Sequence, residues 1–373
     1  MIPTQRLPGS LTPLNTALAA LTERLVPVAP VELPLMEALG CVAAEMSPLN
    51  VYPPHDVAAS DGWALCARDL VGASSYSPLS LAGSPAWVEA GDALPRGCDC
   101  VIDSDLVEVA GAVFEVSAEA IPGQGVRRAG GDIAEGSSPI AAGLPIRQRH
   151  LLLARASGLE KINVRRPRLR LINIPAVSRL TATAQLIAES ARKAGAEIVV
   201  AEAAARDAVS IATALDTGAC DLLLIIGGSG IGRSDATVIA LADRGEVIAH
   251  GIALEPGRTS AVGRIERIPV VALPGAPDQA LAAWWTLVLP VLDCLTGRQP
   301  RETIALPLAR KVSSSVGIAE VVLLERCADG WMPSAVGDPS LTAIAHADAW
   351  LAVAAEAEGF AAGTSVDAYM LSD

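Results

Sequence analysis

The chain has 373 residues, and at about 150 residues per domain this length predicts two or three domains. Its composition is 51% hydrophobic and 18% charged, which is too apolar for a disordered chain. With 28 Lys and Arg against 41 Asp and Glu, the net charge of -13 argues against a general nucleic-acid binder, which requires a basic face. The longest charge-free apolar run, Ala280 to Leu292, contains Pro290 and is too short to span a bilayer, and the N-terminus lacks the apolar run of a signal peptide. We therefore expect a cytoplasmic protein with no membrane partner.

The first predicted helix covers residues 14–26, where apolar residues recur at every third or fourth position. Prolines at positions 27, 30 and 34 then keep the chain extended. Between residues 48 and 145, short apolar segments are interrupted by Gly and Pro, a pattern that predicts a small β-rich domain. A further helix is expected at residues 149–158. The β-rich domain is thus predicted to be inserted between helical segments.

From residue 168 the sequence alternates between apolar strands and amphipathic helices, and it ends in an apolar helix before residue 297. This alternation is typical of a mostly parallel sheet covered by helices. A Pro-containing link then leads to short strands. The prediction is a multidomain α/β protein with four parts: residues 1–45 plus 140–165 as a helical and extended linker domain, 46–139 as the inserted β-rich domain, 166–297 as the α/β domain, and 298–373 as a small C-terminal β domain.

The strongest local motif is an apolar strand, a Gly-rich turn and a helix in succession, LLLIIGGSGIGRSDATVIALAD. Glycines let backbone N–H groups approach an oxyanion, and the start of a helix favours negative charge, so the motif predicts an anion site. It lacks both common nucleotide fingerprints, and a tight turn with glycines for steric reasons remains the alternative. Asp235, just beyond the glycines, is either a helix cap or a metal-binding carboxylate.

Four further motifs are weaker when taken alone. ASDGWAL contains an Asp-Gly turn, and GVRRAGGDIAEG places two adjacent arginines, which can clamp a phosphate, before Asp132. HGIALEPGRT contains a Pro-Gly turn after a strand. LPGAPDQA is a strand end with a Pro-Gly turn at the start of a helix, which is again compatible with an anion. For the first two motifs, a turn without a ligand is the plain alternative.

Taken in order with GDALPRGCDCVI, these motifs resemble the molybdopterin molybdenumtransferase family, the MoeA proteins and the gephyrin E domain, from about residue 14 to the end of the chain. ASDGWAL is similar to the family's SAMDGYA, and IIGGSGIGRSD is similar to its S-G-G-V-S-V-G-x-x-D. The resemblance implies a MoeA-like elongated subunit with a MogA-like α/β domain. It also implies an enzyme of molybdenum cofactor biosynthesis that inserts molybdate into adenylylated molybdopterin and releases AMP with Mg²⁺. A homodimer and a molybdoenzyme client are the implied partners, besides molybdopterin or its adenylylated form.

The resemblance also implies roles for individual residues. Asp61, Asp132 and Asp235 would be catalytic and would position a divalent metal ion. The implied substrate-binding residues are Ser60, Arg127, Arg128, Gly227, Gly228, Ser229, Gly230, Gly232, Pro256, Gly257, Arg258, Pro274, Gly275 and Pro277.

The sequence departs from the family pattern at two places. Residues 173–179 lack the acidic pair of the family's S-T-G-D-E-L, and Glu202 and Asp207 are the candidates to replace it. In the turn that resembles K-P-G-K-P, Glu255 and Arg258 replace the lysines, and a glutamate repels an oxyanion such as molybdate. The alternative to an active enzyme is therefore a catalytically degenerate carrier of molybdopterin or a cofactor-insertion protein. The Gly-rich turn is also similar to that of the MogA adenylyltransferases, so an adenylylating activity is a further interpretation of the α/β domain.

Overall fold

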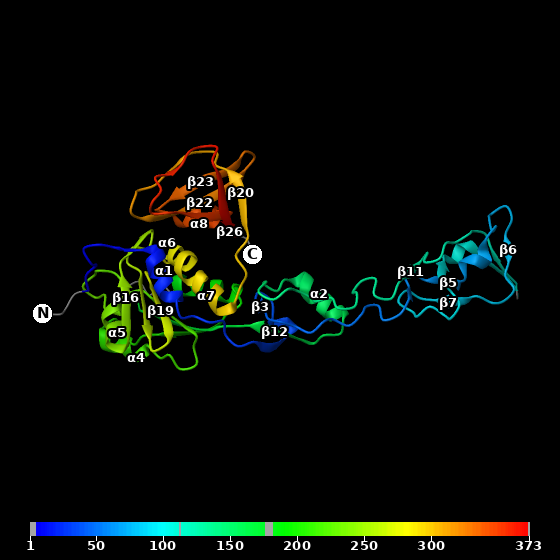
Figure 1. The fold of residues 1–373 in the computed structure, drawn as a ribbon, viewed down its shortest axis with the longest axis horizontal. Coiled ribbons are helices and arrows are strands. Elements are labelled where there is room, and N and C mark those ends of the chain that lie inside the picture. The colour runs from blue at the N-terminus through cyan, green and yellow to red at the C-terminus, as the bar shows by residue number, and fades with distance from the viewer. Residues whose placement is uncertain (1–4, 112, 176–181, 372–373) are drawn as a thin grey trace. The chain divides into compact units, whose positions relative to one another are not determined.

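The computed structural model describes residues 5–111, 113–175 and 182–371. The chain forms two compact units, whose segments can be found in Figure 1 by the colour that follows the residue number. Unit 1 consists of Met1–Glu45, Ala141–Arg147 and Ile162–Asp373, and unit 2 consists of Met46–Ile140 and Gln148–Lys161. The chain thus leaves unit 1 to form most of unit 2 and returns to unit 1 twice.

The centre of unit 1 is a six-stranded sheet with the strand order β14-β13-β15-β19-β18-β16. The pairs β14/β13, β13/β15 and β15/β19 are parallel, whereas β18 and β16 join antiparallel. The mostly parallel sheet that the alternating sequence predicted is therefore confirmed. The strands are β13 (Arg168–Asn173), β14 (Glu197–Glu202), β15 (Leu222–Ile226), β16 (Glu246–His250), β18 (Ala261–Ile265) and β19 (Ile268–Leu273).

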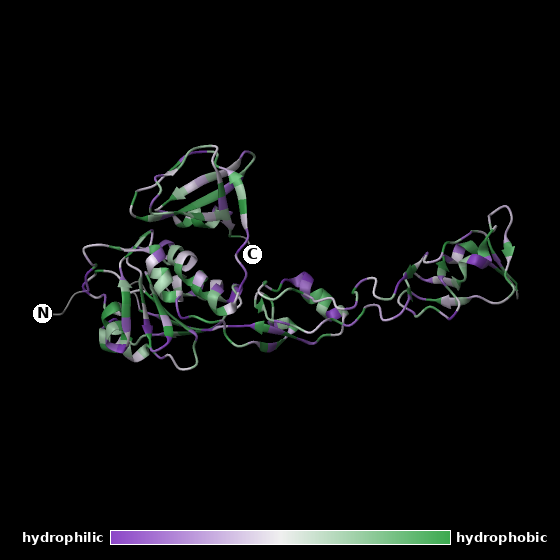
Figure 2. Ribbon diagram, in the orientation of Figure 1, coloured by the Kyte–Doolittle hydropathy of each residue, from purple (hydrophilic) through white to green (hydrophobic). Residues whose placement is uncertain are grey.

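Helices cover both faces of this sheet. Successive side chains of a strand point to opposite sides, so the apolar strands present apolar side chains on both faces, and the helices bury them. Leu222, Leu224 and Ile226 of β15 pack on one face, and Leu223 and Ile225 pack on the other. The sequences of β15 and β19 consist of apolar residues, and Figure 2 shows hydrophobic residues along strands and helices of this unit. On the first face lie α1 (Leu14–Thr22), α3 (Ala182–Lys193), α6 (Pro277–Ala283), a π-helical turn (Trp284–Val288) and α7 (Leu289–Thr296), and on the second face lie α4 (Ala208–Ala214) and α5 (Thr237–Arg244).

The C-terminal segment of unit 1 builds a sheet in the order β1-β17-β22-β24-β26-β20, with β23 paired to β22. Leu254 and Glu255 of β17 pair in parallel with Ala319 and Glu320 of β22, so this sheet joins the C-terminal segment to the α/β part. Trp331 is fully buried in the segment's own core. The elements are β1 (Thr12–Pro13), β17 (Ile252–Glu255), β20 (Thr303–Pro307), β21 (Val312–Ser313), β22 (Ala319–Cys327), β23 (Gly330–Val336), α8 (Leu341–His346), β24 (Ala349–Val353), β25 (Gly359–Phe360) and β26 (Ser365–Met370).

A third sheet of unit 1 has the order β2-β12-β3, with β2 (Val31–Pro34), β3 (Val42–Ala43) and β12 (Lys161–Arg165). Unit 2 is built from short strands, as the Gly- and Pro-interrupted sequence predicted, and it has small apolar cores of its own. Its sheets are β7-β5-β8, β6-β10-β9 and β11-β4. The elements are β4 (Val57–Ala58), β5 (Gly62–Leu65), β6 (Leu79–Ser80), β7 (Ala86–Val88), β8 (Cys100–Ile102), β9 (Val107–Ala110), β10 (Val113–Val116), β11 (Val126–Arg127) and α2 (Gln148–Ala156).

One helix is shorter than predicted, and one apolar helix is longer than the charge-free run inside it. Helix α1 ends at Thr22 rather than near residue 26, because the N–H of Leu25 bonds the Thr22 carbonyl and tightens the last turn. The apolar helical run Pro277–Thr296 has 20 residues, longer than its charge-free part, and by length and composition it passes for a membrane span. However, 72% of its most apolar window is buried inside the protein, as in the core helix of a globular domain.

Candidate functional site

A cavity of about 240 Å³ lies in unit 1 where three parallel strands end. Asn173 ends β13, Ile226 ends β15, and Pro274 directly follows β19. The carboxyl ends of parallel strands are where α/β sheets bind ligands, because the loops that follow them surround a crevice. Of the predicted residues, the cavity is lined by Gly227, Gly228, Ser229, Gly230, Asp235, Pro274 and Gly275.

The glycines of the turn after β15 are required by the backbone. Gly227 and Gly228 have φ angles of 89° and 67°, which favour glycine. A Cβ atom on Gly228 would lie 2.5 Å from Oγ1 of Thr237, and one on Gly230 would lie 2.6 Å from Oδ2 of Asp235. The turn therefore has both a steric reason for its glycines and a compact shape that side chains would disrupt.

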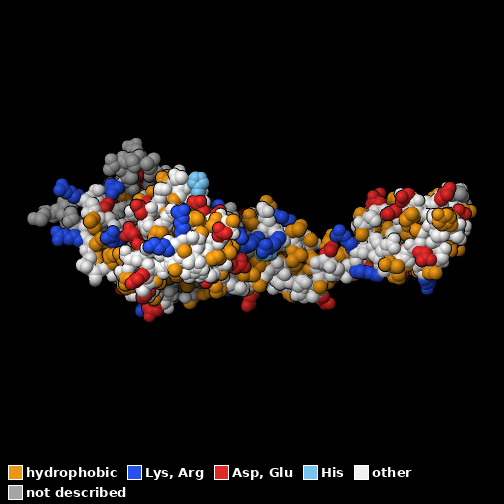
Figure 3. Space-filling model, turned by 90° about the horizontal axis from the view of Figure 1, so that it is seen from above, with side chains coloured by type: hydrophobic (Ala, Val, Ile, Leu, Met, Phe, Trp, Pro, Cys, Tyr) orange, Lys and Arg blue, Asp and Glu red, His pale blue; other side chains and the backbone are white. Residues whose placement is uncertain are grey.

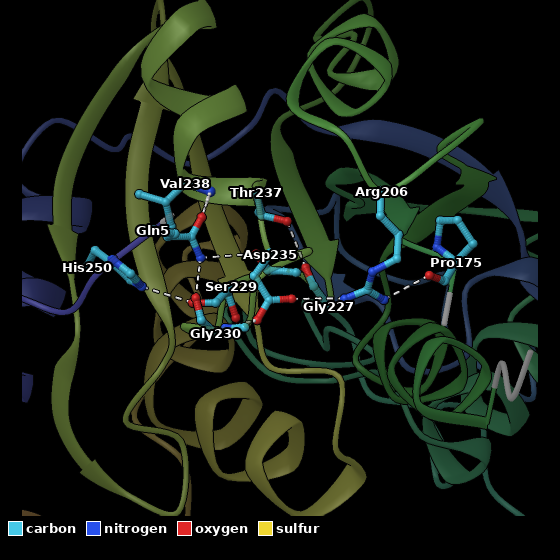
Figure 4. A network of polar contacts seen from close by, with 12 residues as sticks. Gln5, Pro175, Arg206, Gly227, Ser229, Gly230, Asp235, Thr237, Val238 and His250 are labelled. Atoms are coloured by element: carbon cyan, nitrogen blue, oxygen red, sulfur yellow. Dashed lines mark hydrogen bonds and ion pairs between the residues drawn. The ribbon is translucent and has the colours of Figure 1, made fainter. Parts of the chain in front are cut away.

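The carbonyl groups of this turn are already engaged by the protein (Figure 4). The Thr237 hydroxyl donates to the Gly227 carbonyl at 2.8 Å, and the Thr237 N–H donates to the Gly228 carbonyl at 3.0 Å. The Gln5 side-chain amide donates to the carbonyls of Gly228 and Gly230. His250 Nε2 bonds the Ser229 carbonyl at 2.9 Å, which requires the tautomer with a proton on this nitrogen.

The N–H groups of the same turn are free. Within the described residues, the backbone N–H groups of residues 228–231 donate no hydrogen bond to the protein. Ser229 is 1% exposed and its Oγ has no hydrogen-bond partner, although buried hydroxyls normally have one. Free N–H groups in a Gly-rich turn before a helix form a concave binding site for an anion. The turn thus has the hydrogen-bonding capacity that an anionic ligand needs.

Asp235 closes this turn, and Arg206 holds it in place. One carboxylate oxygen of Asp235 accepts the N–H of Gly232, and the other accepts Nη2 of Arg206, each at 2.9 Å. Arg206 also donates from Nη1 to the carbonyl of Pro175 at 2.9 Å (Figure 4). Helix α5 begins at Thr237 with Ala236 in the cap position and no side-chain cap, so the interpretation of Asp235 as a helix cap is wrong.

The Pro-Gly turn after β17 does not line the cavity, although Thr259, two residues after Gly257, does. The peptide bond before Pro256 is cis, and Arg258 forms an ion pair with Glu255 at 3.5 Å. Burial raises the pKa of the Glu255 carboxyl, Arg258 opposes this shift, and nearby carboxylates, first that of Glu320, add to it. Carboxylates therefore outnumber the single guanidinium group around Glu255. Pro277 begins α6, and it lies outside the lining of the cavity together with Gly232, Pro256, Gly257 and Arg258.

Five predicted residues belong to unit 2. The Asp61 carboxylate accepts the N–H of Ala90 at 2.8 Å. Arg127 forms an ion pair with Asp132 at 3.3 Å, and Arg128 forms one with Asp56 at 2.9 Å. The fifth residue, Ser60, is exposed. In this state both arginines bind carboxylates of their own unit.

A metal site was predicted at Asp61, Asp132 and Asp235. Asp61 and Asp132 belong to unit 2 and Asp235 to unit 1. Each has the protein partner described above, and Asp235 is neutralised by a guanidinium group. The described part of the chain contains no group of three or more His, Cys, Asp or Glu side chains placed to hold a metal ion. No metal site is therefore assigned to either unit taken by itself, and the metal-binding role of these three carboxylates stays a prediction.

Several lining residues were missed by the sequence analysis. Arg206 follows β14, and its place beyond the carboxyl end of a parallel strand was a usable signal. Of the two candidates named nearby, Asp207 caps helix α4 through the N–H of Ser210, and Glu202 does not line the cavity. Gln5 lies 223 positions from Gly228 in the sequence, so no local pattern predicted their contact. The predicted residues 176–179 lie outside the described part of the chain.

Two family models match the chain. One is described as "MoeA N-terminal region (domain I and II)" and matches residues 12–158, and the other is described as "Probable molybdopterin binding domain" and matches residues 178–293. The second match contains the whole Gly-rich turn.

Curated relatives and solved structures agree with these models. The chain is 28% identical to "Molybdopterin molybdenumtransferase 2" of Mycobacterium tuberculosis, over 72% of this chain and 76% of that protein. It is 29% identical to "Molybdopterin molybdenumtransferase" of Haemophilus influenzae, over 71% and 72%, and 25% identical to the protein of that name from Synechococcus elongatus, over 92% and 94%. A crystal structure of a molybdopterin biosynthesis MoeA protein from Pyrococcus horikosii matches with a TM-score of 0.73 and 26% identity, over 98% of this chain and 100% of that chain.

Proposed function

Because the chain belongs to the MoeA family, we propose that it is a molybdopterin molybdenumtransferase, an enzyme of molybdenum cofactor biosynthesis. Its reaction is the insertion of molybdate into adenylylated molybdopterin with release of AMP. The relatives from three bacteria carry the name of this activity. In the chain itself, the observation that supports the proposal is the turn at residues 227–230, whose carbonyls are engaged while the following N–H groups are free.

The turn is suited to the phosphate groups of such a ligand. Adjacent N–H groups bind phosphate oxygens because each is a donor and the following helix start adds a partial positive charge. A cavity of about 240 Å³ holds only part of adenylylated molybdopterin, so the remainder of the ligand extends outside it. On the surface drawn in Figure 3, Lys and Arg side chains are interspersed with Asp and Glu side chains, so local donors rather than a broad basic face account for anion binding.

The second candidate is a molybdopterin carrier or cofactor-insertion protein without catalysis. Two features favour it: the missing acidic pair after β13 and the acidic surroundings of Glu255. A carrier binds molybdopterin without using molybdate, so repulsion of an oxyanion near Glu255 does not impair it. The names of the relatives favour the transferase over this alternative.

Further properties belong to the same proposal. Magnesium stays a prediction, and no step is assigned to it because the described side chains do not form a metal site. A homodimer, a molybdoenzyme client that receives the cofactor, and a cytoplasmic location are also proposed. Light scattering of the purified protein tests the dimer, and titration of turnover with Mg²⁺ after EDTA treatment tests the metal.

The deciding experiment is AMP release from adenylylated molybdopterin by the purified protein, with and without molybdate. The transferase releases AMP in a molybdate-dependent manner. Tight binding without AMP release supports the carrier. A protein that neither binds the ligand nor releases AMP contradicts both candidates.

A further inference from the structure

Arg206 connects the two loops that border the cavity in unit 1. Its Nη1 binds the carbonyl of Pro175, in the loop after β13, and its Nη2 binds Asp235, which closes the turn after β15. The Arg206 side chain lines the cavity, and its Nε is buried without a hydrogen-bond partner. A single guanidinium group thus binds both Pro175 and Asp235, with Nε left as an unused donor.

The same ion pair sets the charge of the site. The Asp235 side chain is 16% exposed and lines the cavity beside the free N–H groups of the turn. An uncompensated carboxylate at this place repels an anion, and screening by solvent is weak at low exposure. Arg206 supplies the opposite charge 2.9 Å from the carboxylate. Asp235 therefore stabilises the shape of the turn through its hydrogen bond to Gly232, while Arg206 cancels the negative charge of Asp235.

We propose that Arg206 is a specificity-determining residue that makes this pocket selective for an anionic, phosphate-bearing group by cancelling the charge of Asp235. The inference rests on the proposed function, because it concerns the same pocket. It assigns Asp235 a structural role in the turn instead of a role as metal ligand. Removing the charges of both Arg206 and Asp235 leaves the net charge of the site unchanged, so a double variant tests the role of charge.

The test is a double-mutant cycle on the full-length protein, with inorganic pyrophosphate as the probe. Its Kd is measured by calorimetry, and the amide NMR signals of Ser229 and Gly230 report where it binds. Arg206→Met leaves the Asp235 carboxylate uncompensated beside the ligand and weakens binding about tenfold or more, because like charges repel strongly at a site shielded from bulk water. Asp235→Asn does not weaken binding, and the double variant returns the Kd to within about threefold of the wild type.

A matched control is available in the same unit. Arg170 forms an ion pair with Asp216 at 3.0 Å, and its side chain is 27% exposed, compared with 28% for Arg206. Arg170 does not line the cavity, so Arg170→Met leaves the Kd for pyrophosphate unchanged. If that control weakens binding equally, the effect is general charge and the proposal fails.

Besides an equal effect of the Arg170→Met control, three further results overturn the inference. They are a double variant as weak as Arg206→Met, a loss of binding in Asp235→Asn alone, and no shift of the Ser229 and Gly230 signals in the wild type. The second result remains decisive even if Arg206→Met does not fold. AMP release by the wild-type protein separates the inference from the proposed function. If the wild type releases AMP but the double-mutant cycle fails, only the inference is refuted. If the double-mutant cycle succeeds but the wild type neither releases AMP nor binds molybdopterin, only the proposed function is refuted.

Discussion

Replacing Gly228 by alanine perturbs the Gly-rich turn at its most crowded position. The φ angle of 67° costs a residue with a Cβ about 1–2 kcal/mol. The new Cβ would lie 2.5 Å from Oγ1 of the fully buried Thr237, whose hydroxyl donates to the Gly227 carbonyl at 2.8 Å. Breaking that buried bond costs about 1–3 kcal/mol. The free energy of unfolding is therefore expected to fall by about 2–5 kcal/mol in total.

Urea unfolding followed by tryptophan fluorescence measures this loss. Gly363→Ala is the matched control, because Gly363 lies in the same unit with a φ angle of 82° and has nothing within 4 Å of an added Cβ. The control bears only the backbone cost of about 1–2 kcal/mol. If the two variants lose the same stability, the contact with Thr237 does not hold the turn and the reasoning is refuted.

Four further predictions concern side chains of unit 1 and one thiol of unit 2. Burial raises the pKa of Glu255 in the folded protein above its unfolded value. Protonated Glu255 therefore contributes to the stability of the folded protein below the unfolded pKa, and this contribution is lost as pH rises through the folded pKa. Glu255→Gln should raise the Tm at about pH 8, and this gain in Tm should vanish toward about pH 4. Glu255→Lys should increase molybdate-dependent AMP release, and an unchanged rate means that this turn does not face the oxyanion. Burial raises the pKa of Cys100 to about 11, so iodoacetamide should modify the exposed Cys294 before Cys100, and peptide mass spectrometry that finds the reverse order contradicts this. Trp331→Ala should lower the free energy of unfolding by about 3–5 kcal/mol in urea titration, because the ring is fully buried; a loss below about 1 kcal/mol is inconsistent with that burial.

The sequence predicted those parts of the fold that follow from local patterns. Strand β15 is buried on both faces, so its sequence is a continuous apolar run. Helix α5 is buried on one face, so its apolar residues recur at every third or fourth position. Both patterns are visible in the sequence. The pairing of β17 with β22 was not predictable, because it joins strands distant in the sequence and depends on edges that only the folded sheets present. The end of α1 was misplaced because the bond from Leu25 to Thr22 has no composition signal.

In the candidate site, too, only the features that follow from local sequence patterns were predictable. The glycines of the turn are recognisable because positive φ angles and close packing demand them. The partners that give the turn its chemistry, Gln5, His250 and Arg206, are brought there by tertiary contacts and carry no motif. Asp235 illustrates the difference: its position in the sequence suggested a cap or a metal ligand, and only the neighbouring guanidinium group shows that its charge is already balanced.

We propose that the turn at residues 227–230 binds the anionic part of molybdopterin. A crystal structure of the protein with bound molybdopterin tests it most directly. We expect phosphate oxygens within hydrogen-bonding distance of the N–H groups of Ser229 and Gly230 and of the Ser229 hydroxyl. A ligand bound elsewhere, with these donors still unpaired, would contradict it.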